Sequence, residues 1–217
     1  MLTIQLPPDT LPPWSGALTT AVAALLTRSA AMGVLTGRPI TRLDAATVKR
    51  LIQALQRHGI GANASLLLAP LTTQPPQALD EATQERVVSG LRELNQALEA
   101  SATPSTEWSA MRRVLGDEML IDLLGIGDSS LRRYAAGDRQ TPDSVAARLH
   151  WLAMVVADLA GAYNDFGIRR WFVRPRSQLQ ARSPRDVLGL NWSPDDEGAN
   201  RVRALAAVLS GPQALAA

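Results

Sequence analysis

Cysteine is absent from the chain, and histidine occurs only twice, as His58 and His150. The absence of cysteine excludes disulfides, thiolate metal sites and a thiol nucleophile, and it fits a reducing compartment. The two histidines lie far apart in the sequence, and neither is accompanied by a second ligand at a metal-binding spacing. We therefore expect neither a metal ion nor a cofactor.

Aromatic residues are also scarce, at 4% of the 217 residues, whereas alanine and leucine are abundant. Alanine and leucine favour helices, while sheets are usually filled by aromatic and β-branched residues. The composition therefore predicts an all-α fold, with at most one short strand at 2–6. The apolar run at 16–35 is interrupted by Arg28 and by several hydroxyl residues, so it is too polar to cross a membrane. No basic residue precedes Arg28, as a secretory signal would require, and we expect a cytoplasmic protein.

Lysine is nearly absent, because Lys49 is the only lysine among 22 basic residues. The net charge is +2, and the pI of about 9.6 follows from a small excess of groups that titrate at very high pH. The pI is therefore weak evidence for a nucleic-acid partner. The distribution of charge is more informative, because residues 166–185 hold six arginines and no acid, whereas residues 1–107 are electrically balanced.

Helical patterns extend over most of the chain. Apolar spacing and capping residues predict helices over 15–32, 44–58, 78–100, 106–115 and 141–164, with a loop over 60–77. Thr141 is expected to cap the long helix, with Pro142 at its first position. Shorter helical segments follow over 166–174, 183–189 and 198–210. With a boundary in the polar stretch at 101–105, we expect an N-terminal helical domain (1–104), a helix-turn-helix domain (105–165) and a small helical unit (166–217).

The most informative stretch, residues 119–142, has the layout of a helix-turn-helix. It predicts a short helix ending at Gly125, a tight turn, and a second short helix starting at Asp128. Its inward face is formed by apolar side chains, namely Leu120, Leu123, Leu124, Ile126, Leu131 and Tyr134. The DNA-binding candidates lie on the other faces and in the following loop: Ser129, Ser130, Arg132, Arg133, Arg139 and Gln140. A plain helical hairpin has similar spacing, and three nearby aspartates dilute the positive charge, which favours a weak or cooperative DNA site.

Two segments resemble a known family. The series Leu-Leu-Gly-Ile (123–126), a polar triplet, Leu-Arg-Arg-Tyr (131–134) and Gly-x-Arg-x-x-Pro (137–142) resembles the helix-turn-helix of Xre-like bacterial regulators. Further on come an aromatic residue and a glycine, Trp171, a proline, a leucine, Arg-Ser-Pro and the pair Val187 and Leu188. This order, with the closing stretch 201–211, is similar to the C-terminal region of the Xre/MbcA/ParS antitoxins. The resemblance covers about residues 105–217.

The resemblance implies the antitoxin of a two-gene toxin–antitoxin system. Such antitoxins bind their own promoter through the helix-turn-helix, and their C-terminal region covers the active site of a toxin that has an RES fold and acts on NAD. The implied toxin-facing residues are Trp171, Arg174, Arg176, Arg182, Arg201 and Arg203. Family members are usually shorter, so the first 100 or so residues are an extension for dimerisation or sensing, or they mark a stand-alone regulator without a toxin.

No arrangement of residues in the sequence indicates catalysis, and we expect a protein that is not an enzyme. Residues 125–129 lack the Lys-Ser/Thr ending of a phosphate loop, and the acids at 195–197 fit the solvated start of a helix. The arginines of 166–185 are equally compatible with a solvated face, and Trp171 with a core position. Three hypotheses remain: an antitoxin that binds operator DNA and a toxin, a DNA-binding regulator without a toxin, and a helical adaptor. Readers of this type are mostly two-fold dimers, so we expect a homodimer.

Overall fold

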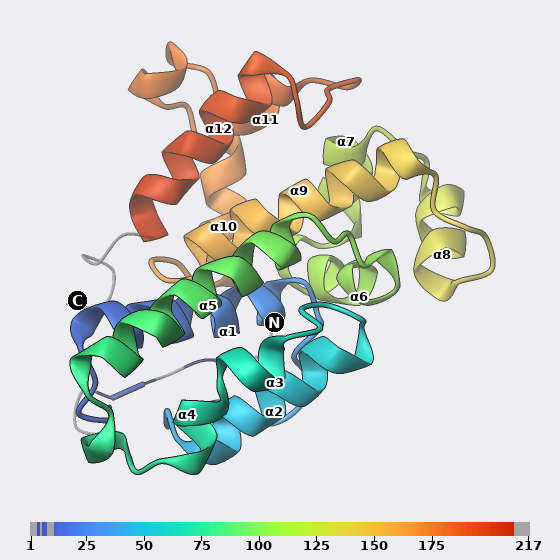
Figure 1. The fold of residues 1–217 in the computed structure, drawn as a ribbon. Helices are drawn as coiled ribbons and strands as arrows, with labels where there is room; N and C mark the ends of the chain where they lie inside the picture. Colours follow the sequence, from blue (N-terminus) through green and yellow to red (C-terminus); the bar gives the residue numbers. More distant parts are fainter. Residues whose placement is uncertain (1–3, 5, 8–10, 211–217) are drawn as a thin grey trace. The chain divides into compact units, whose positions relative to one another are not determined.

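The computed structural model describes residues 4, 6–7 and 11–210, and these residues fold into helices (Figure 1). No β-strand is present within these residues, which confirms the all-α prediction. Contacts divide the chain into two compact units, Leu2–Ser101 and Ala102–Ala217, called here the N-terminal and the C-terminal unit. The segments 105–165 and 166–217 lie together within the second of these units.

The N-terminal unit is built on two long helices that pack together, α1 (Gly16–Ala31) and α5 (Glu81–Glu99), with α2 (Ala45–Arg57) beside them. Local capping sets where each helix begins. Ser15, Asp44 and Asp80 each accept a hydrogen bond from a backbone amide three residues later, at 3.3, 2.8 and 2.8 Å. These bonds satisfy amides that have no partner within their own helix.

The prediction of a loop over 60–77 is wrong, because short helices occupy much of this segment. They are α3 (Ala64–Leu67), α4 (Ala69–Thr73) and the 3₁₀ turn η2 (Pro76–Ala78). Pro70 and Pro76 lie in the first turns of α4 and η2, where a missing amide costs nothing, so these prolines do not exclude helix. The strand expected at 2–6 falls mostly outside the described residues, and Ile4 forms an isolated bridge with Ile40.

The C-terminal unit is formed around α9 (Asp143–Leu159), whose second half is buried on all sides. Packed on α9 are α6 (Pro104–Leu115), α7 (Asp117–Leu124) and α12 (Glu197–Ala207), and α8 (Asp128–Ala136) packs on α6 and α7. The remaining elements are α10 (Asp165–Val173), η3 (Ser177–Leu179), α11 (Pro184–Leu188) and η4 (Val208–Ser210).

The prediction for the long helix is wrong at both ends. Pro142 is the N-cap and Asp143 the first helical residue, whereas the Thr141 hydroxyl accepts a hydrogen bond from the indole N–H of Trp108, at 2.9 Å. The helix ends at Leu159 rather than near 164, because Gly161 follows in a turn and Asn164 caps the next helix, α10. The predicted segment 183–189 contains α11, and Ser183 is its N-cap, accepting from the amide of Asp186.

Candidate nucleic-acid interface

The turn between α7 and α8 depends on a glycine. Gly125 ends α7 with φ of 64°, in the left-handed region that glycine adopts most easily. A Cβ atom at this position would lie 2.5 Å from the carbonyl oxygen of Leu190, so the chain also passes too close for a side chain. The two short helices and the tight turn predicted at Gly125, Gly127 and Asp128 are therefore present.

The start of α7 is fixed by a bidentate ion pair. Arg112, near the end of α6, donates to both carboxylate oxygens of Asp117, at 2.7 and 2.6 Å. This hydrogen bonding holds the pKa of Asp117 below its usual value and raises the pKa of Arg112. Asp117 is the first residue of α7, where a negative charge also suits the helix dipole.

The second helix, α8, is anchored by two buried side chains, Leu131 and Tyr134. The ring of Tyr134 stacks on Trp108 of α6, with centroids 6.1 Å apart and planes at 26°. The same Trp108 holds Thr141 in the loop that follows α8. Trp108 thus fixes both the helix and its exit loop, and it is a positioning residue that the sequence reasoning did not identify.

Five of the six predicted DNA-binding residues are exposed on α8 and its exit loop, namely Ser129, Arg132, Arg133, Arg139 and Gln140. The sixth, Ser130, is half-buried. Arg132 forms an ion pair with Asp128, one helical turn before it, at 2.7 Å, and its side chain remains 73% exposed. Arg139 lies over the outer face of Tyr134, with its guanidinium carbon 5.6 Å from the ring centroid. The structure therefore presents these residues on one helix and the adjoining loop.

The N-terminus of α8 is open to an anion. Its N-cap is Gly127, and no side chain caps the first turn. Amides at such an end carry partial positive charge and favour phosphate groups. Asp128 lies in the same turn, but its carboxylate is engaged by Arg132. Asp122 likewise forms an ion pair with an arginine, Arg185. Two of the three aspartates that dilute the positive charge of this region are therefore paired with arginines.

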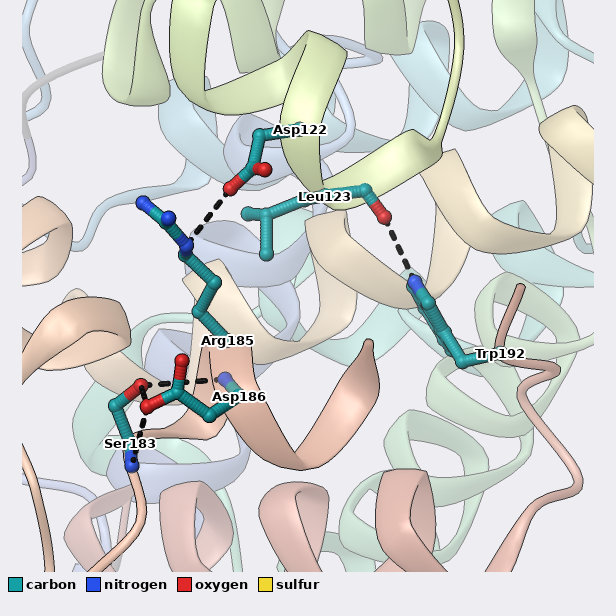
Figure 2. A network of polar contacts seen from close by, with 6 residues as sticks. All are labelled: Asp122, Leu123, Ser183, Arg185, Asp186 and Trp192. Carbon is teal, nitrogen blue, oxygen red and sulfur yellow. Dashed lines mark hydrogen bonds and ion pairs between the residues drawn. The ribbon is translucent and has the colours of Figure 1, made fainter. Parts of the chain in front are cut away.

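Three hydrogen bonds cap the C-terminal ends of α6 and α7 from elsewhere in the unit. Figure 2 shows the indole N–H of Trp192 donating to the carbonyl of Leu123 at 2.7 Å, beside the ion pair of Arg185 with Asp122 at 2.9 Å. Arg148 of α9 donates to the carbonyl of Leu124 at 2.9 Å, and Arg169 of α10 to the carbonyl of Val114 at 2.6 Å. Carbonyls at helix ends lack partners within the helix, so these donors attach α6 and α7 to the rest of the unit.

The residues predicted to face a protein partner do not share one environment. Trp171 is buried, with 1% of its surface exposed, so its assignment to a partner surface is corrected. Arg174 and Arg182 are exposed. Arg176, Arg201 and Arg203 are half-buried, the last two on α12.

A buried polar pair connects α6 and α9. Glu107, fully buried, lies 2.6 Å from Nδ1 of His150 through one carboxylate oxygen. The sequence analysis assigned no partner to His150, because Glu107 lies 43 residues earlier and no local pattern signals the pairing. The pair is enclosed within the fold and supplies no exposed catalytic group.

No protein-family model, curated protein or solved structure matches the chain. In the part of the chain that the structure describes, no helix is both long and apolar enough to cross a lipid bilayer. The same part contains no group of three or more acidic or histidine side chains arranged to hold a metal ion.

Proposed function

We propose that the C-terminal unit binds double-stranded DNA, with α8 as the recognition helix in the major groove. The observation that carries this proposal is the combination of a firmly anchored α8 and an exposed polar face. Leu131 and Tyr134 are buried against the unit, whereas Arg132 and Arg133 are exposed. Such a helix places base-reading side chains in the groove while its uncapped N-terminus favours phosphate.

Arg133 is the residue on which the proposal is best tested. Unlike Arg132, it has no acidic partner among the described residues. Replacement by alanine is expected to weaken operator binding by roughly 1–3 kcal/mol if the guanidinium contacts a guanine, with relaxed preference at one base pair. The measurement is a gel shift or fluorescence anisotropy titration with the promoter upstream of the protein's own gene, at several salt concentrations.

Arg182→Gln is the matched control, since it removes one exposed positive charge from the same unit but not from α8. It is expected to change affinity much less than Arg133→Ala. Unchanged affinity in Arg133→Ala would exclude the proposed base contact. If the unaltered protein fails to bind DNA even at low salt, where electrostatic attraction is strongest, the adaptor hypothesis is favoured instead.

We further propose, from the resemblance to the Xre/MbcA/ParS antitoxins, that a dimer of the chain neutralises an RES-type, NAD-degrading toxin and represses its own promoter. The structure is compatible with exposed contacts at Arg174 and Arg182. The alternative is a stand-alone regulator without a toxin. An adjacent reading frame for a small NAD-degrading protein, neutralised on co-expression, favours the antitoxin. Its absence favours the regulator.

A further inference from the structure

A small pocket beside α10 is lined by basic and neutral donors. Its volume is about 350 Å³, and its walls include Arg170, Arg174 and Arg176 together with Tyr163, Trp171 and Ser177. No acidic side chain lines it. By contrast, the larger cleft beside α7, of about 1060 Å³, is lined by three acids as well as three arginines. The small pocket is therefore a site of concentrated positive charge.

Two residues that line this pocket each carry a buried donor without a hydrogen-bond partner among the described residues. These donors are the indole N–H of Trp171 and the Nε–H of Arg176. Trp171 is 1% exposed, and the guanidinium of Arg176 lies over its ring, 5.0 Å from the centroid. Buried polar groups are nearly always paired, and leaving one unpaired is costly. Two unpaired donors on residues that line the same pocket favour the binding of an acceptor there.

The loop after α10 holds Arg176 in place through an unusual backbone. The amide of Arg176 donates to the carbonyl of Arg182, and its carbonyl accepts from Ala181, both at 3.0 Å. Gln180 and Ala181, which close this loop, have φ values of 58° and 59°, in the left-handed region that is unfavourable for side-chain-bearing residues. Strained conformations of this kind concentrate at binding sites.

We propose that this pocket binds the phosphate group of a small phosphorylated molecule. Guanidinium groups match the oxygens of phosphate in geometry and charge. Three arginines carry enough positive charge to favour a phosphate dianion over a singly charged carboxylate ligand. The volume exceeds that of a bare ion and lies in the range of small-molecule sites. The phosphate oxygens accept from Arg176 and from the indole of Trp171, while Arg170 and Arg174 at the exposed rim neutralise the remaining charge.

The indole N–H signals in an ¹⁵N–¹H NMR spectrum provide a direct test. The full chain is titrated with inorganic phosphate and with phenyl phosphate, at constant ionic strength in chloride. The Trp171 signal is identified by its absence in Trp171→Phe. We expect a saturable downfield displacement of this signal, reached at lower concentration with phenyl phosphate, while the signals of Trp14, Trp151 and Trp192 stay in place.

Variants separate the pocket from general positive charge. Arg174→Gln and Arg176→Gln are each expected to weaken phosphate binding about tenfold, whereas Arg182→Gln, which removes a charge outside the pocket, has little effect. An equal loss in Arg182→Gln, or no saturable displacement in the unaltered chain, would overturn the proposal. Equal binding of acetate would overturn the preference for phosphate.

The proposal stands apart from DNA binding, and the two fail separately. Arg133→Ala is expected to retain phosphate binding, because Arg133 does not line the pocket. A short DNA duplex is expected to leave the Trp171 signal unchanged. If the duplex displaces that signal as phosphate does, the pocket contacts the DNA backbone and the assignment to a small ligand is wrong.

Discussion

Single residues in this protein act mainly by completing hydrogen bonds at helix ends, and Ser183 and Asp186 show this most clearly. The Ser183 hydroxyl accepts from the Asp186 amide, and the Asp186 carboxylate accepts from the Ser183 amide, both at 3.2 Å, which closes a capping box at the start of α11 (Figure 2). The Ser183 hydroxyl also donates to the same carboxylate at 2.5 Å. The hydrogen bond from the Ser183 side chain is the largest cause of a lowered pKa of Asp186, and the bond from the Ser183 backbone amide is the next largest.

Ser183→Ala is expected to raise the pKa of Asp186 toward its ordinary value, because the largest cause of the shift is removed. A pKa lowered in the folded state stabilises the fold above the ordinary aspartate pKa of about 4, and this contribution is lost as the pH falls below it. The loss of the cap costs about 0.5–2 kcal/mol at neutral pH, and the difference from the unaltered protein shrinks in acid. Carboxyl NMR titration and denaturant unfolding at several pH values measure both effects.

Asp117 is the internal control for this experiment. Its pKa is lowered by Arg112, which has no part in the capping box, so it should titrate identically in both proteins. A pKa of Asp186 that does not change in Ser183→Ala would show that the serine hydroxyl does not stabilise the carboxylate.

At the scale of elements, α7 is held by bonds to its C-terminal carbonyls. Trp192→Phe removes the donor to Leu123 and leaves that carbonyl buried without a partner. Trp171→Phe removes the same atoms from another buried tryptophan, but its N–H has no partner to lose. The first variant is therefore expected to be less stable than the second by about 1–3 kcal/mol in phosphate-free buffer, measured by chemical unfolding. Equal stability would mean that the bond to Leu123 contributes nothing.

The elements also show what the sequence alone can predict. The starts of α1, α2 and α11 were predicted correctly because Ser15, Asp44 and Ser183 act on amides three residues away. The helices within 60–77 were missed because this segment contains three prolines and little helical periodicity, whereas buried Leu68 and Leu71 hold it against its neighbours. Local signals decide where a helix starts, and packing decides whether a short one persists.

The candidate site also has a part that the sequence predicts and a part that depends on distant contacts. The exposed face of α8 was predictable from its periodicity, since Leu131 and Tyr134 lie three residues apart on one side. The contacts that position it were not, because Trp108 and Thr141 are separated by 33 residues, and Trp192 and Leu123 by 69. The pocket at Arg176 depends on a left-handed loop at Gln180 and Ala181, which no turn residue in the sequence signals.

At the scale of the whole molecule, each of the two units encloses its own buried side chains. Four of the five tryptophans belong to the C-terminal unit, so fluorescence reports mainly on that part. Leu91→Ala, in the core of the N-terminal unit, is expected to lower the free energy of unfolding by about 2–5 kcal/mol. Part of the helical circular dichroism signal should then be lost at lower denaturant concentration. The fluorescence transition should stay in place.

Leu149→Ala is the matched change in the C-terminal unit, since Leu149 is equally buried, and it should advance the fluorescence transition. If Leu91→Ala shifts both signals together, the two units unfold as one cooperative structure, and the division by contacts has no thermodynamic counterpart.

The side chains that attach α8 to the unit are distinct from those that the proposed DNA binding requires. Only Leu131 and Tyr134 are buried, while Asp128, Ser129, Arg132, Arg133 and Ala136 face outward. Exchanges at these outward positions leave the contact with Trp108 intact. Under the proposed DNA binding, a lineage, or a combinatorial library randomised at these positions, would explore new recognition sequences on an unchanged fold, and the preferred DNA sequence would diverge faster than the fold.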